Sequence, residues 1–468
     1  MQTFQTTDPE TWRLIVLRSN TREVLFVGGH RGLALPCVEV PKGSRVAREL
    51  SERVRSEWDL DVFCLRELAA SEPRFRNGGL RPFLLEAICT NPDIPESARW
   101  LELSEIAMHR LADAETRNAV ETWLRQAAEV HAYGVRQRIG DPGTFSRIRA
   151  WVEARLANSG RKLRIEFQQL NASWDFSLVR FTTDREAVWF KAVGDPNVRE
   201  FSLALTLADL FPQFAPPILA AEPLWNAWLA PEIPGCRLSQ REDLAAWRRV
   251  AHDLASLQCA SVGKTEAILA CKARDLRCPA LLGSVSAFFA RLAEFMTRQR
   301  SSQPAPLRRA ELVELEDEVR RSLSELEAEG CPDTLGHLDL NPDNLIVLPE
   351  RAVFLDWAEA SVGYPFFSLA YLLEHFRSRF QHDGHAQLVR AYAEVWQEEK
   401  RFENVERTIC RAMFVAIFVH AVSTDAWRED SGASALPVDG YYRSLARRMK
   451  AYAKRIREGA TVVSDLWT

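Results

Sequence analysis

The chain has 468 residues, of which 47% are hydrophobic and 26% are charged, and its formal net charge at pH 7 is −4. This length exceeds one ordinary core and predicts roughly two to four domains. The composition is that of a folded globular protein and excludes a collagen-like or extensively disordered chain. The slightly negative charge argues against a dedicated nucleic-acid-binding protein.

The cysteines and the apolar runs indicate the compartment. Nine cysteines are scattered along the chain without a CxxC pair, a spacing that predicts reduced thiols rather than a zinc site. The N-terminal residues MQTFQTTDPETW lack the basic and apolar regions of a signal peptide. No run of about 18 apolar residues predicts a helix that spans a membrane. We therefore expect a cytoplasmic protein with no nucleic-acid partner and no membrane partner.

The first 130 residues predict a separate α+β module. Two apolar runs, Leu14–Leu17 and Val24–Val27, flank a polar turn and predict a β-hairpin. A Glu-rich stretch over Val46–Trp58 predicts a helix with one apolar seam and one solvated face. The elements expected after this helix are strands near residues 62–65 and 82–89 and a last helix over residues 113–127.

This order of elements, with Leu35-Pro36 before a helix that runs into WDLDV, resembles a Nudix domain over roughly residues 10–128. The resemblance implies an α/β/α fold for residues 1–130. It does not extend to the magnesium-binding carboxylates, because only Glu57 matches a glutamate of the Nudix box and one carboxylate is too few for a hard cation. The other box positions carry Ser44, Arg53 and Ser56 in place of glutamate and Val38 and Asp59 in place of glycine. We therefore expect a degenerate Nudix-like domain without the hydrolase site.

A second module is predicted after a linker. Residues 131–144 contain several glycines and no sustained period, which indicates a linker. A helix over Phe145–Ala157 and two strands near residues 163–170 and 176–181 follow. The polar turn 171–175 joins these two strands.

The next strand, AVWFKAV, carries Lys191 within an apolar run. A lysine in a buried strand is costly unless it is paired or functional. Glu200, at the start of the following amphipathic stretch, is the expected partner. The alternative is an edge strand whose lysine points to water.

The C-terminal part is predicted to be mostly helical. An amphipathic helix over Leu244–Gln258 opens it, and helices are expected to fill residues 368–457. An apolar stripe that includes His420 is interpreted as core. The basic run Arg443–Arg457 is interpreted as a solvated helix face rather than a nucleic-acid patch.

Residues 336–357, GHLDLNPDNLIVLPERAVFLDW, contain the residues most suited to catalysis. Apolar runs on either side of PER predict two short strands joined by a tight turn. Antiparallel pairing brings Asn344, at the start of the first strand, and Asp356, at the end of the second, to the same end of the hairpin. Asp339 lies on the loop before it. The two neighbours interpreted only as turn formers are Asn341 and Asp343.

Phosphoryl transfer uses such a set, because one carboxylate orients the attacking hydroxyl while oxygen ligands hold magnesium on the triphosphate. The spacing from Asp339 to Asn344 equals that of the protein-kinase catalytic loop, and Asp356 after the hairpin matches the metal-binding Asp of kinases. HLDLNPDN followed by LDW resembles more closely the aminoglycoside phosphotransferase and choline kinase branch of kinase-like enzymes. The resemblance implies a bilobal kinase-like fold, with an N-lobe and hinge over residues 145–235 and a mostly helical C-lobe over residues 236–468.

The resemblance also implies a role for each candidate residue. The roles are Asp339 as the catalytic base, His337 as a brace of its loop, Asn344 and Asp356 as magnesium ligands, and Lys191, Glu200 and Ser173 as nucleotide-binding residues. Ser173 and Ser177 would replace the glycines of the kinase phosphate loop. Leu229–Glu232 would lie at the adenine-binding hinge. Ser368 stands where many relatives carry an Asp that supports the catalytic loop.

We therefore predict a Mg²⁺-dependent phosphotransferase that moves the γ-phosphoryl group of ATP or GTP to a hydroxyl of a small molecule. The alternative is a nucleotide or metabolite sensor, in which the Nudix-like domain supplies the ligand site and the kinase-like part binds nucleotide without turnover. The intact set of Asp339, Asn344 and Asp356 favours the enzyme. The glycine-free turn and Ser368 favour the sensor.

Overall fold

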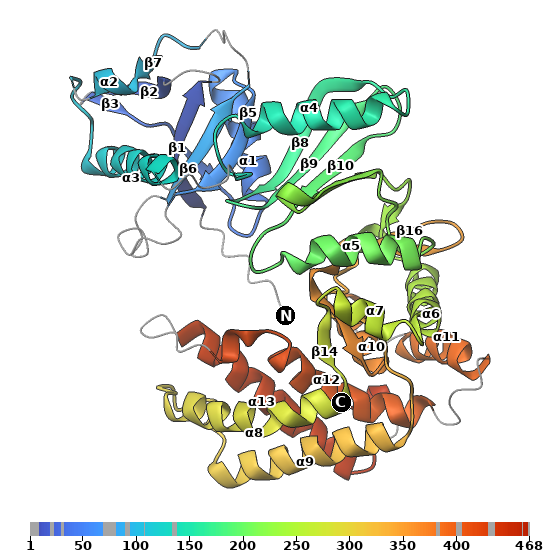
Figure 1. Cartoon of the computed structure of the whole chain (residues 1–468). Helices are drawn as coiled ribbons and strands as arrows, with labels where there is room; N and C mark the ends of the chain where they lie inside the picture. Colours follow the sequence, from blue (N-terminus) through green and yellow to red (C-terminus); the bar gives the residue numbers. More distant parts are fainter. Residues whose placement is uncertain are drawn as a thin grey trace. The chain divides into compact units, whose positions relative to one another are not determined.

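The computed structural model describes residues 9–18, 23–29, 32–68, 81–88, 94–106, 108–132, 138–380, 384–398, 405–428, 436–460 and 462–466. Most of the segment on which the expectation of no signal peptide rests lies outside these residues. The chain divides into two compact units (Figure 1). The first unit comprises Gln2–Phe201 and Pro217–Glu232, and the second comprises Ser202–Pro216 and Ile233–Thr468.

The N-terminal part of the first unit is a mixed sheet with helices. The strand order is β3-β2-β1-β6-β5, with β4 paired to β1 and β7 to β2, and β1 and β6 are parallel. The strands are β1 (Glu10–Arg18), β2 (Glu23–Gly29), β3 (Gly32–Ala34), β4 (Cys37–Val40), β5 (Val62–Glu67), β6 (Arg81–Ala87) and β7 (Ala98–Glu102). The helices are α1 (Val46–Trp58), α2 (Leu103–Ile106) and α3 (Ala114–Ala132).

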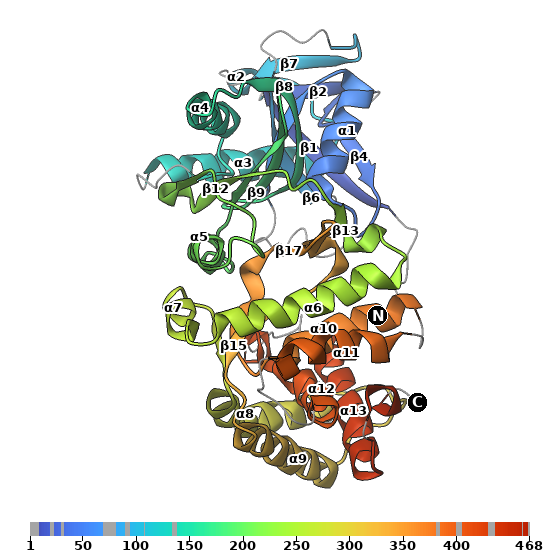
Figure 2. The ribbon, with the colours of Figure 1, turned by 90° about the vertical axis from the view of Figure 1, so that its right-hand side faces the viewer.

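The two faces of this sheet bury different residues, because side chains alternate along a strand. Leu14 and Val16 of β1 pack in one core with Leu50 and Val54, the seam of α1. Ile15 of β1 packs in a second core that includes residues of α3. Figure 2 shows α1 and α3 on opposite sides of the sheet. The predicted hairpin, helix and α/β/α order are therefore present, while the assignment to the Nudix class stays a prediction.

The solvated face expected for α1 is also present. Arg53, Ser56 and Glu57 are exposed, and Glu52 forms an exposed ion pair with Arg48. These residues lie on the helix face opposite its buried seam.

A second, antiparallel sheet completes the first unit, with the order β11-β12-β10-β9-β8. Its strands are β8 (Leu163–Ala172), β9 (Ser177–Thr183), β10 (Val188–Ala192), β11 (Ala220–Glu222) and β12 (Ala227–Pro231), and the helices beside it are α4 (Thr144–Ala157) and α5 (Arg199–Leu210), which continues into the second unit.

The two sheets of the first unit share a core. β5 and α1 lie beside β8 (Figure 1). The rings of Phe63 from β5, Phe145 from α4 and Phe167 from β8 contact one another, with centroids 4.8 to 6.2 Å apart. The predicted Nudix-like domain and the predicted N-lobe therefore bury apolar surface against each other, and the domain boundaries drawn from the sequence stay a prediction.

The second unit is mostly helical, as expected. Its helices are α6 (Leu244–Ser261), α7 (Thr265–Ala270), α8 (Cys278–Thr297), α9 (Arg309–Ala328), α10 (Phe366–Phe380), α11 (His385–Glu398), α12 (Val405–Val422) and α13 (Leu436–Arg457). Its short strands are β13 (Cys236–Arg237), β14 (Arg274–Leu276), β15 (Thr334–His337), β16 (Leu345–Val347), β17 (Ala352–Phe354) and β18 (Ala360–Gly363). One apolar core runs through these elements.

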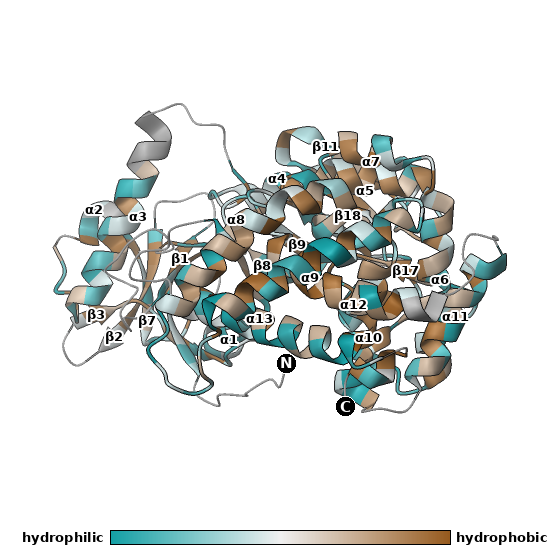
Figure 3. Cartoon of the chain, turned by 90° about the horizontal axis from the view of Figure 1, so that it is seen from below, coloured by the Kyte–Doolittle hydropathy of each residue, from teal (hydrophilic) through white to brown (hydrophobic). Residues whose placement is uncertain are grey.

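Two helices are relevant to the expectation that the protein binds neither a membrane nor a nucleic acid. Helix α8 alone, among the helices described, is long and apolar enough to cross a membrane, although Arg291 and Glu294 interrupt its apolar run. Its apolar residues, Phe288 among them, lie in the core of the second unit. Helix α13 carries hydrophilic residues along its length (Figure 3), and Arg448 and Lys450 form ion pairs with acidic residues of the same unit.

Candidate active site

The predicted hairpin forms from β16 and β17. Leu345 pairs with Phe354 and Val347 pairs with Ala352. Beyond the pairing, the Leu355 N–H donates to the Asn344 carbonyl oxygen over 2.8 Å. The start of the first strand and the end of the second therefore lie side by side.

Asp356 ends the hairpin in an uncommon backbone conformation. Its φ is 62°, in the left-handed region, which an aspartate tolerates better than a branched residue does. The next residue, Trp357, is buried and its Nε1 donates to the Phe354 carbonyl oxygen over 3.1 Å. This turn leaves the Asp356 side chain exposed at the end of the hairpin.

His337 braces the loop before the hairpin. Its ring is buried, with Nε2 2.9 Å from the Leu355 carbonyl oxygen and Nδ1 3.2 Å from the backbone N–H of Asp339. Only a neutral ring protonated at Nε2 satisfies both partners. Burial lowers the pKa of His337, which favours that neutral form. The ring also packs on Trp357, with centroids 4.6 Å apart.

Ser368 supports the same loop from α10. Its side chain is fully buried, and its hydroxyl oxygen accepts a 2.9 Å hydrogen bond from the His337 backbone N–H. A Cβ on the neighbouring Gly336 would lie 2.6 Å from Ser361 Oγ, so a larger residue does not fit there. Serine therefore takes over support of the loop where an aspartate was expected.

Asp339 and Asn344 contact each other directly. The Asn344 Nδ2 donates to Asp339 Oδ2 over 3.0 Å and to the Asp339 carbonyl oxygen over 3.1 Å. These bonds leave Asp339 Oδ1 and Asn344 Oδ1 for other partners. In the part of the chain that the structure describes, no lysine or arginine forms an ion pair with Asp339. The carboxylate is therefore held in place without being neutralised.

In the first unit, Lys191 forms the predicted ion pair. Its Nζ lies 2.5 Å from Glu200 Oε1 at the start of α5, and both side chains are largely buried. The strand that carries it, β10, is hydrogen-bonded to β9 on one side and β12 on the other. This central position excludes the alternative of an edge-strand lysine that points to water.

The turn between β8 and β9 places its two serines differently. Ser173 is exposed, and its backbone N–H closes the turn on the Phe176 carbonyl oxygen over 2.8 Å. Ser177 is only 1% exposed and its hydroxyl accepts a hydrogen bond from Gln169. Ser173 is therefore the serine hydroxyl that this turn presents to solvent.

At the predicted hinge, Glu232 is already engaged. Arg180 holds its two carboxylate oxygens over 2.6 and 2.7 Å, which lowers the pKa of Glu232. Its backbone N–H donates to the Ala187 carbonyl oxygen over 2.9 Å. The Leu229 carbonyl oxygen accepts from the Leu219 N–H over 2.7 Å, so the carboxylate and N–H of Glu232 and this oxygen all have partners within the protein.

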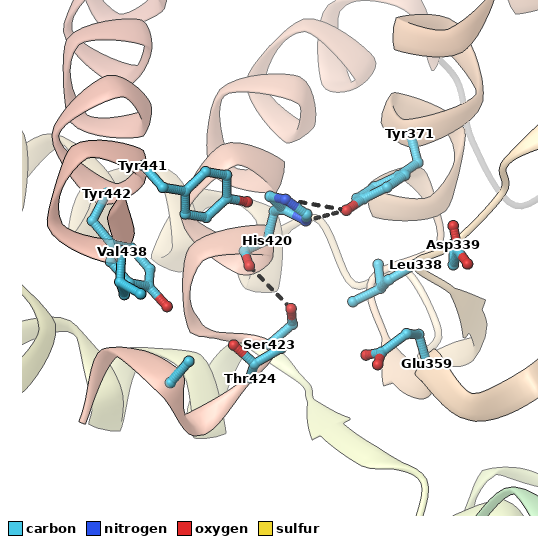
Figure 4. A pocket seen from close by; sticks show the side chains of 11 residues that line it. Leu338, Asp339, Glu359, Tyr371, His420, Ser423, Thr424, Val438, Tyr441 and Tyr442 are labelled. Carbon is cyan, nitrogen blue, oxygen red and sulfur yellow. Dashed lines mark hydrogen bonds between the residues drawn. The ribbon is translucent and has the colours of Figure 1, made fainter. Parts of the chain in front are cut away.

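A pocket of about 510 Å³ opens beside Asp339 within the second unit (Figure 4). It is lined by Leu338, Asp339, Glu359, Tyr371, His420, Ser423, Thr424, Ala426, Val438, Tyr441 and Tyr442. The Tyr371 hydroxyl hydrogen-bonds to the His420 ring, and Tyr441 lies on the other side of that ring (Figure 4).

The charges around this pocket are few. Glu359 forms a 2.7 Å ion pair with Arg274. Burial, and next the nearby Arg448, lower the pKa of His420 to about 4, so that this ring is neutral at pH 7. The pocket is therefore an aromatic, largely uncharged chamber with the Asp339 carboxylate in its wall.

A model of the phosphotransferase enzyme family matches residues 166–402, slightly more than half of the chain. This chain belongs to that family. It is a small-molecule phosphotransferase, and the match covers most of the second sheet and the hairpin of β16 and β17 but not the N-terminal sheet. A search of curated proteins gives no match.

Several solved structures are similar to this phosphotransferase. A macrolide 2'-phosphotransferase from Brachybacterium faecium is 18% identical, with a TM-score of 0.42, over 64% of this chain and 96% of that one. A putative aminoglycoside phosphotransferase from Ralstonia eutropha is 16% identical, with a TM-score of 0.45, over 65% and 98%. A choline kinase from Streptococcus pneumoniae is 13% identical, with a TM-score of 0.42, over 65% and 99%.

The donor set of the phosphotransferase suits magnesium. Magnesium takes oxygen ligands and is commonly held by one or two carboxylates together with substrate phosphates. Asn344 offers its Oδ1, since its Nδ2 is bound to Asp339, and Asp356 offers an exposed carboxylate. No cluster of three or more His, Cys, Asp or Glu side chains occurs among the described residues. A metal would therefore need oxygens from the nucleotide as well.

Sequence reasoning missed the pocket. Tyr371, His420 and Tyr441 come from α10, α12 and α13, and each lies on an amphipathic helix whose pattern alone predicts core. His420 was interpreted as core, whereas it lines the pocket. The signal that could have found these residues is the polar tip that each aromatic side chain carries on an otherwise apolar helix face.

Proposed function

We propose that this phosphotransferase moves the γ-phosphoryl group of ATP or GTP to a hydroxyl of a small molecule, with Asp339 as the catalytic base. The observation that carries the proposal is the position of Asp339. Its carboxylate is fixed by Asn344 and lies in the wall of a pocket large enough for a small molecule.

The proposed reaction is an in-line displacement. The acceptor oxygen attacks the γ-phosphorus, the bond to the nucleoside diphosphate oxygen breaks, and the hydroxyl proton passes to the carboxylate. Since Asn344 occupies Asp339 Oδ2, Oδ1 is the oxygen that would take the proton. His337 would keep the loop in this position through its bonds to the Asp339 N–H and the Leu355 carbonyl.

Each unit carries its own proposed ligands for parts of the nucleotide–metal complex, and each set is argued from its own surroundings. In the first unit, Lys191 paired with Glu200 and the exposed Ser173 would bind the phosphates. In the second unit, Asn344 and Asp356 would hold Mg²⁺. Bound there, the ion would neutralise charge on the transferring phosphoryl group.

The pocket supports an acceptor of modest size. Tyrosine rings and neutral His420 form much of its lining. The Ser423 hydroxyl donates to the His420 carbonyl oxygen over 3.0 Å, while the Thr424 side chain can donate a hydrogen bond. Glu359 forms an ion pair with Arg274, which offsets its negative charge. An acceptor with a ring or apolar face and one reactive hydroxyl directed at Asp339 fits these walls.

The cytoplasm, where ATP is abundant and thiols stay reduced, is the proposed location.

Membership of an enzyme family and the intact set of Asp339, Asn344 and Asp356 favour turnover over the sensor alternative. Ser368 is therefore not an argument for the sensor alternative, because its hydroxyl accepts a hydrogen bond from the His337 backbone N–H.

The experiment is a screen for acceptor-dependent ADP release. Purified protein is incubated with MgATP or MgGTP and a panel of aminoglycosides, macrolides, sugars, amino alcohols and nucleosides, with EDTA as the metal control. We expect at least one class to stimulate release, and EDTA to abolish it. Tight nucleotide binding without release from any class would instead support the sensor.

A further inference from the structure

The turn of residues 173–176, hereafter the β8–β9 turn, is held by residues from outside its own sheet. The ring of Trp174 lies flat against Arg66 of β5, with the guanidinium carbon 3.6 Å from the ring centroid. Arg66 is only 2% exposed. Burial lowers the pKa of Arg66 to about 10, so it is still a cation at neutral pH, as stacking on an aromatic face requires.

Gly140 ties the same turn to Arg66. Its N–H donates to the Trp174 carbonyl oxygen over 2.8 Å, and its carbonyl oxygen accepts from Arg66 Nη1 over 2.8 Å. A Cβ at this position would lie 2.9 Å from Trp174 Cα and 3.0 Å from the Ser173 carbonyl oxygen. Glycine is therefore required by the close approach of the two backbones. Arg138 lies 3.7 Å from Asp175 at the same turn.

The base of the turn is held as well. The Gln169 side chain accepts from the Cys64 backbone N–H over 2.7 Å and donates to the Cys64 carbonyl oxygen over 2.8 Å. The same amide nitrogen lies 3.2 Å from Ser177 Oγ, where β9 begins. All three residues are buried. The tip and the base of the turn are thus both fixed to β5.

We propose that the N-terminal module, the described residues from 9 to 132, positions the β8–β9 turn for the nucleotide phosphates, with Arg66 as the positioning residue. This inference rests on the proposed function, because it takes the turn to bind phosphates. A turn without glycines that is fixed before the ligand arrives loses less conformational entropy on binding. The module therefore completes the nucleotide site without touching the nucleotide.

The proposal separates nucleotide binding from acceptor binding. Releasing the turn should raise the KM for ATP and leave the KM for the acceptor unchanged, since the acceptor pocket is built within the other unit. A general loss of stability would not raise the KM for ATP while leaving the KM for the acceptor unchanged. A misplacement of about 1 Å caused by a mutation far from the reacting atoms can lower the rate by about 100-fold.

The test compares two buried arginines of the module in the full-length protein. Arg66→Met removes the contact with Trp174, while the control, Arg13→Met, removes an arginine of β1 whose ion-pair partners, Asp113 and Glu115, are not residues of the turn. We expect both to lower the melting temperature, and only Arg66→Met to raise the Kd for MgATP, by roughly tenfold or more.

Two milder variants keep the test decisive if an arginine variant does not fold. Gly140→Ala inserts one methyl group against the turn, and Trp174→Leu removes the stacked ring from the turn itself. Both should weaken MgATP binding measured by calorimetry. MgATP binding by Lys191→Met tests the proposed function alone, because Lys191 is proposed to bind the phosphates and is not part of the turn.

The outcomes are separable. If Lys191→Met loses MgATP affinity while Arg66→Met, Gly140→Ala and Trp174→Leu bind as tightly as the wild type, the inference is wrong and the proposed function stands. If the wild type itself binds neither MgATP nor MgGTP, both are overturned. Weakened binding in the turn variants with an unchanged acceptor KM supports the inference.

Discussion

The hairpin of β16 and β17, with the loop before it, and the β8–β9 turn are held in place in different ways. Around the hairpin, the bonds of the Asp339 carboxylate and of the His337 ring join residues close in sequence, Asn344 and Leu355. More distant residues add support, since Ser368 accepts from the His337 N–H and Asp253 accepts from the Ala352 N–H. In the turn, the supports come from far away, and Gln169 bonds to a backbone 105 positions earlier. Candidate residues that bond to one another within a short stretch can be recognised from the sequence, whereas a turn held by a different module cannot.

The first prediction concerns Asp356, at the end of the hairpin, and the affinity for ATP in the presence of magnesium. Asp356→Ala removes the charged oxygen ligand proposed for Mg²⁺, and the affinity for ATP in the presence of magnesium should fall by roughly 100-fold. Calorimetry with and without EDTA measures it. Glu350→Ala, which removes an exposed carboxylate from the other end of the hairpin, is the matched control. An unchanged affinity in Asp356→Ala would place the metal elsewhere.

Ser368 tests whether the hairpin loop depends on one partner from a helix. Ser368→Ala leaves the buried His337 N–H without its acceptor, which should cost about 1–3 kcal/mol of stability in urea titration. Ser378→Ala, on the exposed face of the same helix α10, should cost much less. Equal losses in the two variants would show that the contact does not support the loop.

A further prediction concerns the dependence of stability on pH. The pKa of His420 is lowered to about 4 by burial, whereas an unfolded chain titrates near 6.5. Between these values the unfolded state binds more protons, so stability should fall as the pH is lowered from 6.5 towards 4. His420→Gln, which keeps a hydrogen-bonding group beside Tyr371, should flatten that dependence in thermal melts. An unchanged slope would mean that other groups control it.

Sequence patterns predicted the local elements well. The helix over Val46–Trp58 has the predicted ends, and the hairpin of β16 and β17 brings together Asn344 and the residue before Asp356. The Lys191–Glu200 pair also forms as predicted. In each case the pattern lies within one or two neighbouring elements, where periodicity and turn residues decide the structure.

The contacts that the sequence did not predict depend on packing between segments that are far apart in the chain. Nothing in the order of residues places Arg66 on Trp174 or Tyr371 beside His420. The shared core of the two sheets, built on Phe63, Phe145 and Phe167, was hidden because each phenylalanine also suits the core of a separate domain. Side-chain chemistry identified candidates, but only the fold shows which of them meet.

The most direct test of the account is the comparison of Asp339→Asn with Asp343→Asn. The two aspartates lie four residues apart on the catalytic loop, but Asp343 is exposed and bonded to Ser239, while Asp339 lines the pocket. With an accepted hydroxyl compound, Asp339→Asn should lower kcat by about 10² to 10⁴ and leave the Kd for ATP nearly unchanged, while Asp343→Asn should retain both. Full turnover in Asp339→Asn would contradict the account.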